Sequence, residues 1–329
     1  MKLYGLEEHM ATAEVMQAWQ RRDPGLTEPM MKWALAGDTR RDLLDLDDGR
    51  IAAMDDAGID TAVLSFTTPG LQSLDGPEAA ALQGPANDAI AAAVRRHPGR
   101  LQGFATLATP APAAAADELR RAVTRLGLNG ALVNAHSGGR SLDAPEFWDI
   151  FEAAADLRAP IYLHPRAPVP VVTDAYYRGF DAPVDALLAT GAFGWHYEAG
   201  LTVLRMIVAG VFDRFPDLQI ILGHWGEVVL FYLDRIAILD AVTSLQRPIA
   251  EYFRSNIHIT PGGISSHKYL RWSLETVGVD RIMYASDYPF NRERAGSARR
   301  FLAEAPISDA DRARIAFRNW EELIAGIRR

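Results

Sequence analysis

The sequence predicts an α/β fold of the (β/α)8 TIM barrel type, on three observations. Short apolar runs typical of buried strands alternate with longer segments of helical spacing over the whole chain. We count eight such runs in 329 residues, the number and size typical of one closed parallel barrel. No linker, composition break or fixed-period repeat divides residues 1–329, so we expect a single domain.

The expected strands are short runs rich in β-branched and other apolar residues. They span residues 3–6, 61–66, 101–107, 131–134, 161–163, 220–222, 257–260 and 282–285. The segments between them contain good helix formers, and we expect helices over 47–57, 78–97, 113–126, 145–157, 198–215 and 227–245. Ser308, with Asp311 three residues later, nearly matches a capping box and predicts an extra C-terminal helix over 308–329.

Two connections are longer than a barrel needs. Residues 10–46 follow the first strand, and residues 166–195 follow the fifth. Loops that follow barrel strands lie at the carboxyl face, where active sites are built. We therefore expect both connections to lie beside the site.

Composition restricts the chemistry. The chain has 42 acidic and 34 basic residues and a net charge of −8, so it lacks the basic surface that nucleic acids and anionic membranes attract. It has no cysteine, so a metal must be bound by His, Asp or Glu. The N-terminus is charged where a signal peptide is apolar, and no run reaches the ~20 apolar residues of a membrane span. A cytoplasmic enzyme is expected.

Four polar side chains follow predicted strands and are candidate metal ligands. Glu7 and His9 stand two residues apart after the first strand, so in an extended chain they point to the same face. His164 ends the fifth strand and Asp287 follows the last. Two carboxylates and two imidazoles would form a site for Zn²⁺ or Mn²⁺, with Mg²⁺ as an alternative.

A second pair follows the sixth strand. His224 ends the run at 220–223, and Glu227 comes three residues later. An imidazole that transfers protons needs a group that orients it, and a carboxylate at this spacing can do so. The sequence contains no GxGxxG, P-loop, GxSxG or HExxH signature that would indicate another chemistry.

Each of these residues also has a structural interpretation. A single His at a strand end is more often structural than a ligand, and an Asp before Tyr-Pro can simply begin a turn. We expect Glu8 to be solvated or salt-bridged and His97 to cap its helix electrostatically. Three histidines without a recognisable partner are interpreted as structural: His196, His258 and His267.

At this point the sequence resembles a known family. The strings LEEH at 6–9, YLHP at 162–165, ILGHWGE at 221–227, VFDRFP at 211–216 and YASDYPF at 284–290 resemble the amidohydrolase superfamily. More narrowly, they resemble its metal-dependent decarboxylases, which include the γ-resorcylate, dihydroxybenzoate, 5-carboxyvanillate and aminocarboxymuconate-semialdehyde decarboxylases. The pattern extends over nearly the whole chain.

Two details resemble the hydroxybenzoate subgroup. The first motif is ExH, as in the γ-resorcylate enzymes, where most hydrolases have HxH. The segment NAHSGGRSLD at 134–143, which contains His136, is similar to the segment that follows the fourth strand in that subgroup, although Ala135 and Gly138 depart from its usual residues.

The resemblance implies a role for each candidate. Glu7, His9, His164 and Asp287 match the metal ligands. His224 and Glu227 match the catalytic pair that does not bind metal. In such an enzyme Asp287 would carry a proton to the ring carbon, while His224, held by Glu227, would polarise the substrate hydroxyl or assist the transfer.

We therefore predict a metal-dependent carboxy-lyase that decarboxylates a small aromatic carboxylate, a hydroxybenzoate above all. The rival is a metal-dependent hydrolase of a lactone, ester or amide on the same barrel, and a third alternative is a barrel that binds without catalysis. The resemblance implies a homodimer or homotetramer. Four side chains are candidate substrate contacts: Trp195, Arg235, Tyr288 and Phe290.

Overall fold

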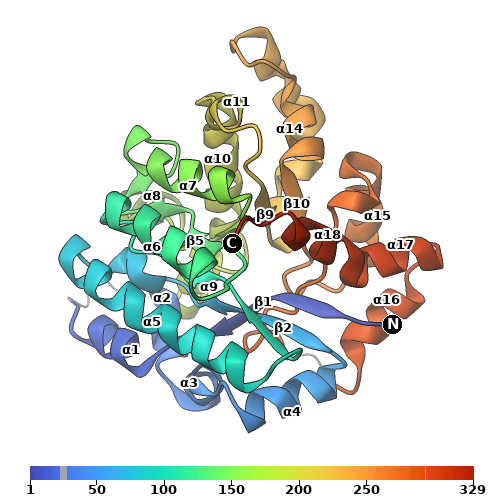
Figure 1. The fold of residues 1–329 in the computed structure, drawn as a ribbon. Helices are drawn as coiled ribbons and strands as arrows, with labels where there is room; N and C mark the ends of the chain where they lie inside the picture. Colours follow the sequence, from blue (N-terminus) through green and yellow to red (C-terminus); the bar gives the residue numbers. More distant parts are fainter. Residues whose placement is uncertain (23–27, 293) are drawn as a thin grey trace.

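The structure is a computed structural model that describes residues 1–22, 28–292 and 294–329. It confirms the (β/α)8 barrel (Figure 1). The parallel strands pair in the orders β1-β2-β3 and β10-β9-β8-β5-β4. Their bounds are Tyr4–Met10 (β1), Thr61–Phe66 (β2), Leu101–Gly103 (β3), Ala105–Thr106 (β4), Ala131–Asn134 (β5), Ile161–His164 (β8), Ile220–Leu222 (β9) and Ile257–Ile259 (β10).

Backbone hydrogen bonds join the two sheets into one barrel. The third predicted strand is divided at Phe104, so that β3 pairs with β2 while β4 pairs with β5. The predicted strand at 282–285 is not a regular strand. Its backbone still closes the barrel, because Leu6 N donates to Tyr284 O at 3.1 Å and Met283 N donates to Ile259 O at 2.9 Å.

Helices surround the strands as predicted, and most of their bounds agree within about three residues. The helices of this outer layer are α4 (Asp48–Ala57), α5 (Gly76–Arg96), α6 (Pro112–Thr124), α7 (Trp148–Leu157), α14 (Ile249–Ser255), α15 (His267–Val277) and α16 (Ser297–Glu304) (Figure 1). The helix predicted over 198–215 starts earlier and is divided into α10 (Gly194–Val208) and α11 (Val211–Arg214). Gly210 separates them with a φ of 81°, a left-handed conformation that ends a helix.

The helix predicted over 227–245 is wrong. The segment forms only short pieces: η4 (Val229–Tyr232), α13 (Leu233–Ile236) and η5 (Ala237–Ala241). Glu227 and Val228 have φ values of 54° and 62°, which a right-handed helix cannot include. The side chains of this segment do have helical spacing. The left-handed backbone at residues 227 and 228 nevertheless prevents one continuous helix.

The C-terminal segment is helical and closes one end of the barrel. It consists of α17 (Asp309–Ala313), a π-helical turn (Arg314–Arg318) and α18 (Asn319–Ala325). The predicted cap is present, since Ser308 Oγ accepts from Asp311 N at 3.1 Å. Trp320 of α18 is 1% exposed and packs edge-to-face on Phe104, with ring centroids 5.6 Å apart. This end is therefore filled with side chains rather than open to a ligand.

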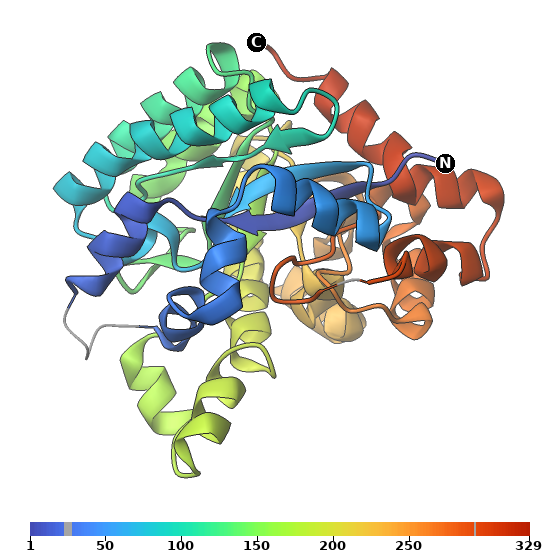
Figure 2. The same cartoon turned by 90° about the horizontal axis from the view of Figure 1, so that it is seen from below.

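The two long connections carry short helices of their own. The first contains α1 (Ala13–Gln20), α2 (Pro29–Ala34) and α3 (Gly37–Leu44), and the second contains α8 (Pro170–Tyr176) and α9 (Ala182–Ala189). In Figure 2 both termini lie at the top, while the yellow-green α8 and α9 project from the opposite side. The terminal segments therefore lie on one side of the barrel, and α8 and α9 of the second long connection lie on the other.

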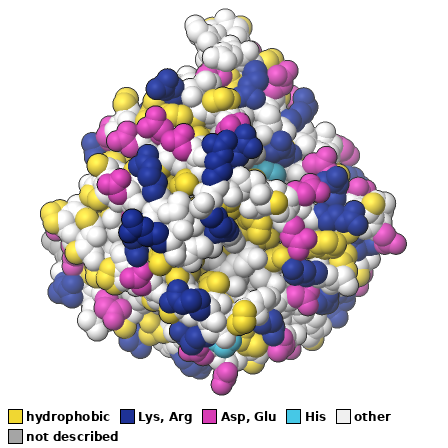
Figure 3. Space-filling view, in the orientation of Figure 1, with side chains coloured by type: hydrophobic (Ala, Val, Ile, Leu, Met, Phe, Trp, Pro, Cys, Tyr) yellow, Lys and Arg dark blue, Asp and Glu magenta, His cyan; other side chains and the backbone are white. Residues whose placement is uncertain are grey.

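The surface carries charges of both signs. Basic and acidic side chains are interspersed over the face shown in Figure 3. Among the described residues no helix has the length and apolar character needed to cross a membrane.

A buried histidine makes the stability of the fold depend on pH. His258 lies in β10 and is 6% exposed, and burial together with the nearby Arg281 lowers its pKa to about 3. In the unfolded chain the pKa would be about 6.5. Between these values only the unfolded state takes up the proton, so stability is lost as pH falls from about 6.5 toward 3.

We predict that His258→Gln makes stability less dependent on acid. Glutamine can still accept a hydrogen bond from Arg281, but it does not ionise. The free energy of unfolding in urea, measured from pH 7 to pH 4, should fall less steeply than in the wild type, by up to about 1.4 kcal/mol per pH unit. Parallel curves for the two proteins would contradict this assignment.

Candidate metal centre

Four side chains converge at the carboxyl ends of the strands. Glu7 and His9 come from β1, His164 ends β8 and Asp287 follows the closing segment at 282–285. His164 Nε2 lies 3.1 Å from Glu7 Oε1, and His9 Nε2 lies 3.2 Å from Asp287 Oδ1. One ligand atom from each of the four lies within 4.8 Å of the others. The structure thus brings together the four residues expected to bind metal.

The alternation of β1 explains how two ligands come from one strand. Glu7 and His9 are fully buried on the face that points into the barrel mouth. Glu8 lies between them, and its carboxylate accepts from Ser286 N at 3.1 Å and from Ser286 Oγ at 2.7 Å. It is 2% exposed and its hydrogen-bond partner is the uncharged Ser286, so the expectation of a solvated or salt-bridged carboxylate is wrong. Glu8 instead ties β1 to the segment that carries Asp287.

The hydrogen bonds around these ligands leave lone pairs that face one another. His164 Nδ1 lies 2.7 Å from Pro165 O, and because a carbonyl only accepts, this nitrogen carries the proton. The unprotonated Nε2 then faces Glu7 Oε1. Glu7 Oε1 and His9 Nε2 are both buried without any hydrogen bond. Buried lone pairs that face one another without a donor destabilise a protein. A cation bound between them would accept these lone pairs and remove that cost.

The protonation of the ligands agrees with metal binding. Burial lowers the pKa of His9 to about 4, which keeps its imidazole neutral. Burial alone would raise the pKa of Glu7, but the positive charge of His224 outweighs it and lowers the pKa to about 2. Neutral imidazoles and ionised carboxylates are the forms that bind divalent ions.

Asp287 differs from the other ligands. Burial and the negative charge of Glu7 raise its pKa to about 8. A divalent cation beside it would favour the ionised carboxylate. Asp287 is therefore a carboxyl group whose proton affinity depends strongly on the charges around it, which is the property a proton carrier needs.

His224 and Glu227 form the expected pair. His224 Nδ1 lies 2.8 Å from Glu227 Oε1, and its Nε2 points toward the ligand set, 4.0 Å from Glu7 Oε1. Burial would lower the pKa of His224, but the carboxylates of Glu227 and Glu7 raise it to about 10. His224 is therefore a cationic imidazole held beside the four ligands, an arrangement suited to donating a proton or a hydrogen bond.

The backbone of this pair is unusual. Residues 224–228 all have positive φ, between 48° and 82°, and only Gly226 among them is a glycine. Left-handed conformations in non-glycine residues cost energy and are held only by surrounding contacts. The turn aims His224 and Glu227 at each other without a helix.

Glu227 has a second partner that sequence reasoning missed. His196, from the start of α10, places its Nδ1 2.8 Å from Glu227 Oε2. The sequence predicts a structural role for His196, because its spacing does not distinguish it from His258 or His267. Only the packing of α10 brings it to Glu227.

A cavity of about 710 Å³ opens onto the centre. His9, His164, His224 and Asp287 line it, so the ligands face a space large enough for a small aromatic acid. Both long connections contribute to its wall, as expected. Their lining residues are Met30, Trp33 and Thr39 from the first, and Leu187, Gly191 and Trp195 from the second.

The four expected substrate contacts divide into two groups. Trp195 and Phe290 line the cavity. Tyr288 does not, because its ring packs under the buried guanidinium of Arg50, 4.5 Å from the ring centroid. Arg235 is exposed on α13 and is not among the lining residues. Of the four, only Trp195 and Phe290 therefore line the cavity.

Two further residues support the candidate ligands from outside the cavity. Tyr162 donates to Glu7 Oε2 at 2.5 Å, and Arg50 Nη2 donates to the backbone oxygen of His9 at 2.6 Å. His136, in the hairpin of β6 (His136–Ser137) and β7 (Arg140–Ser141), is not among the lining residues and contacts none of the candidate ligands directly, since its Nε2 lies 3.0 Å from Ala167 O. Nothing in their sequence spacing indicated these contacts.

The comparison with known proteins agrees with this geometry. The amidohydrolase family model matches residues 19–323. The chain belongs to the amidohydrolase family. Gamma-resorcylate decarboxylase of Polaromonas sp. strain JS666 is 36% identical over 331 residues, which cover 97% of each chain.

Solved structures resemble this amidohydrolase over nearly its whole length. The 5-carboxyvanillate decarboxylase LigW of Sphingomonas paucimobilis has a TM-score of 0.89 at 33% identity, over 99% of both chains. The 5-carboxyvanillate decarboxylase of Novosphingobium aromaticivorans, complexed with manganese and 4-hydroxy-3-methoxy-5-nitrobenzoic acid, has a TM-score of 0.89 at 31% identity, over 98% of this chain and 96% of that one.

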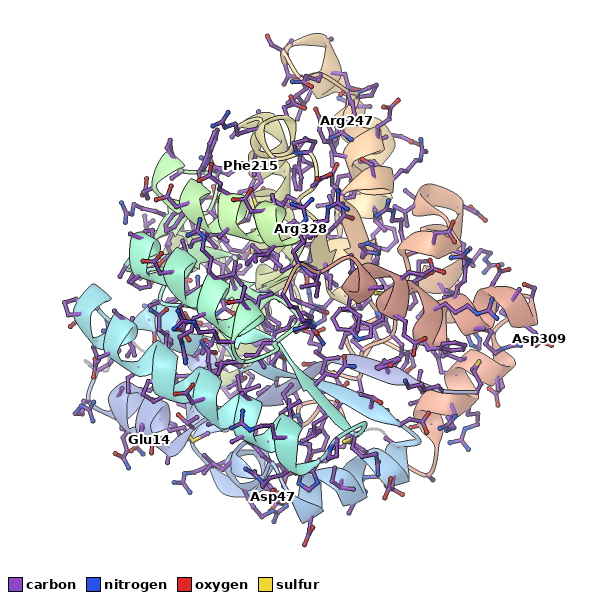
Figure 4. The ribbon with its side chains drawn as sticks, in the orientation of Figure 1. Glu14, Asp47, Phe215, Arg247, Asp309 and Arg328 are labelled. Atoms are coloured by element: carbon purple, nitrogen blue, oxygen red, sulfur yellow. The ribbon has the colours of Figure 1, made fainter. Side chains whose placement is uncertain are left out.

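We predict that His164→Ala loses metal while His97→Ala keeps it. His164 offers a lone pair to the centre, whereas His97 is bound to Asp47, which lies at the edge of the molecule (Figure 4). Elemental analysis of the purified proteins should give about one divalent ion per chain for the wild type and for His97→Ala. Affinity in His164→Ala should fall at least about tenfold. Equal metal content in both variants would remove His164 from the ligand set.

Proposed function

We propose that this amidohydrolase is a divalent-metal-dependent, non-oxidative decarboxylase of a small aromatic carboxylate, a hydroxybenzoate in particular. The observation that carries the proposal is the joint placement of the four candidate ligands and of the His224 imidazole, held by Glu227, on one cavity with aromatic walls. The similarity to decarboxylases of hydroxylated benzoates supports it. Residues 1–329 would act as one domain.

Glu7, His9, His164 and Asp287 would hold the metal, Mn²⁺ or Zn²⁺, with Mg²⁺ as an alternative. When bound, the metal would supply positive charge that fixes the substrate carboxylate and an adjacent hydroxyl and offsets their charges. Glu7 Oε1 and His9 Nε2, which are buried without a hydrogen bond, support this assignment. Trp195 and Phe290 stand where they would contact the ring.

Decarboxylation requires a proton at the ring carbon that bears the carboxylate. Protonation there interrupts the aromatic system, and the C–C bond then breaks so that its electron pair restores the ring while CO₂ leaves. Asp287 would carry the proton, because it lies in the cavity wall and its pKa is raised. His224 would donate a hydrogen bond to the substrate hydroxyl or assist the transfer, held in place by Glu227.

We predict that turnover in D₂O places one deuterium on the carbon that had carried the carboxylate. A panel of hydroxybenzoates, assayed for CO₂ by mass spectrometry and for product by NMR, tests this. The product incubated alone with the enzyme in D₂O controls for exchange after the reaction.

The rival hydrolase predicts a different isotope pattern. A lactone, ester or amide hydrolase would release no CO₂ and would incorporate oxygen from water into an acid product. Label from H₂¹⁸O in such a product, with no deuterium on a ring carbon, would replace the proposed function by hydrolysis.

We further propose a homo-oligomer, a dimer or tetramer, and a cytoplasmic location, with no nucleic acid or membrane partner. The support for association is an apolar surface between α10 and η4, where large hydrophobic side chains are 41–66% exposed around a depression of about 460 Å³. A contiguous patch of this kind marks an interface more often than free surface. Its residues are Phe193, Tyr197, Leu201, Phe231 and Tyr232.

We predict that light scattering gives a mass of two or four chains, and that Tyr232→Asp reduces it to one. Tyr232 is 66% exposed, so the variant should fold as the wild type does. An exposed substitution outside the surface, Arg328→Asp, serves as the control. A wild-type mass of one chain would contradict the oligomer, and an unchanged mass in Tyr232→Asp would place the interface elsewhere.

A further inference from the structure

The carboxylate of Glu227 is held from both sides. It is fully buried, and each of its oxygens faces one imidazole nitrogen at 2.8 Å, from His224 on Oε1 and from His196 on Oε2. The two rings lie 4.6 Å apart between centroids. Three residues from two separate segments of the barrel therefore form one chain of contacts that ends at the cavity.

The packing of α10 makes this arrangement specific. Gly200 lies so close to Glu227 that a Cβ there would meet the backbone oxygen of Glu227 at 2.4 Å. His196 precedes Gly200 by four residues, so both lie on the same face of the helix. Because residue 200 has no side chain, α10 can pack closely against Glu227. His196, which lies one turn earlier in the helix, then reaches the carboxylate of Glu227. Gly194 similarly lets the start of α10 approach Ala189, whose oxygen would be 2.4 Å from an added Cβ.

The other side of the His196 ring is also bound. Its Nε2 lies 3.1 Å from Gly191 O, in the short connection between α9 and α10. Both partners of the ring are acceptors, and the ring satisfies both when each nitrogen carries a proton. His196 also lines the catalytic cavity with His224. The ring is therefore fixed at both nitrogens and has no remaining polar atom for substrate.

We propose that His196 is a positioning residue for the decarboxylation. With one oxygen bound, the carboxylate of Glu227 could still turn about its last side-chain bond, which has only a broad preference. A second donor on Oε2 stops that rotation, so that Oε1 stays in line with His224 Nδ1 and His224 Nε2 stays aimed at the cavity. The inference rests on the proposed function, in which His224 is the group being positioned.

The experiment compares His196→Ala with His196→Asn. The amide nitrogen of asparagine can take the place of the ring Nδ1 and donate to Glu227, whereas alanine cannot. In the metal-loaded enzyme, with a hydroxybenzoate that the wild type turns over, His196→Ala should lower kcat about 10- to 100-fold. KM should stay within about twofold because no polar atom of His196 is free for substrate. His196→Asn should recover most of the loss, and metal content should be unchanged in both.

A double-mutant cycle separates positioning from a general loss of structure. If His196 acts through Glu227, then His196→Ala should add less than about twofold in a Glu227→Gln background. His267→Ala is the matched control, because His267 also binds a backbone oxygen, that of Phe301, but lies on α15 outside the cavity lining. It should keep wild-type kcat.

Three results would overturn the proposal: an unchanged kcat in His196→Ala, a loss confined to KM, or a loss of equal size in the Glu227→Gln background. A spectroscopic readout keeps it testable even if no hydroxybenzoate is turned over. In the Zn²⁺-loaded protein the His224 Nδ1 proton should give a downfield NMR signal that is absent in His224→Asn. That signal should persist in His267→Ala and in His196→Asn, and it should broaden or disappear in His196→Ala. An unaltered signal in His196→Ala would also overturn the proposal.

Discussion

The burial of one carboxylate, that of Glu7, determines which groups must surround it in this site. Glu7 is fully buried at the barrel mouth, where an unpaired charge would cost several kcal/mol. Positive charge and donors must therefore surround it. Tyr162 donates to one oxygen, His224 brings a cationic ring within 4.0 Å of the other, and His164 presents only a lone pair. A cation among the four candidate ligands would complete this arrangement, so the burial of Glu7 would link metal binding to the imidazole of His224.

The supports of the ligands lie on the outer side of the same strand. Because side chains alternate along β1, Glu7 and His9 face the cavity while Glu8 faces the other way and binds Ser286. Arg50 fixes the backbone oxygen of His9 from that outer side. Contacts of this kind hold ligands that loops alone would leave loose. The first strand and the last segment of the barrel are thus joined at the point where both contribute a ligand.

Sequence reasoning brought the four candidate ligands together because it needed only local geometry. Strand alternation and the common direction of parallel strands suffice to bring Glu7, His9, His164 and Asp287 to one edge. The same reasoning could not find His196, because its position depends on how closely α10 packs against Glu227. It misjudged Glu8 for a similar reason, since an acidic pair in sequence does not reveal which carboxylate is covered. Tertiary packing decided both.

The turn after β9 shows how a rigid frame can hold a conformation that the local sequence disfavours. Left-handed backbone costs roughly 1–3 kcal/mol per strained residue, and His224, Trp225 and Glu227 all adopt it. Trp225 anchors the turn, because its backbone nitrogen donates to Thr260 O at 2.8 Å and its indole donates to Ile264 O at 2.7 Å. A regular helix would satisfy these residues locally but would send successive side chains around its axis. The strained turn instead directs the imidazole of His224 and the carboxylate of Glu227 to one point, so its energetic cost is tied to the orientation of this pair.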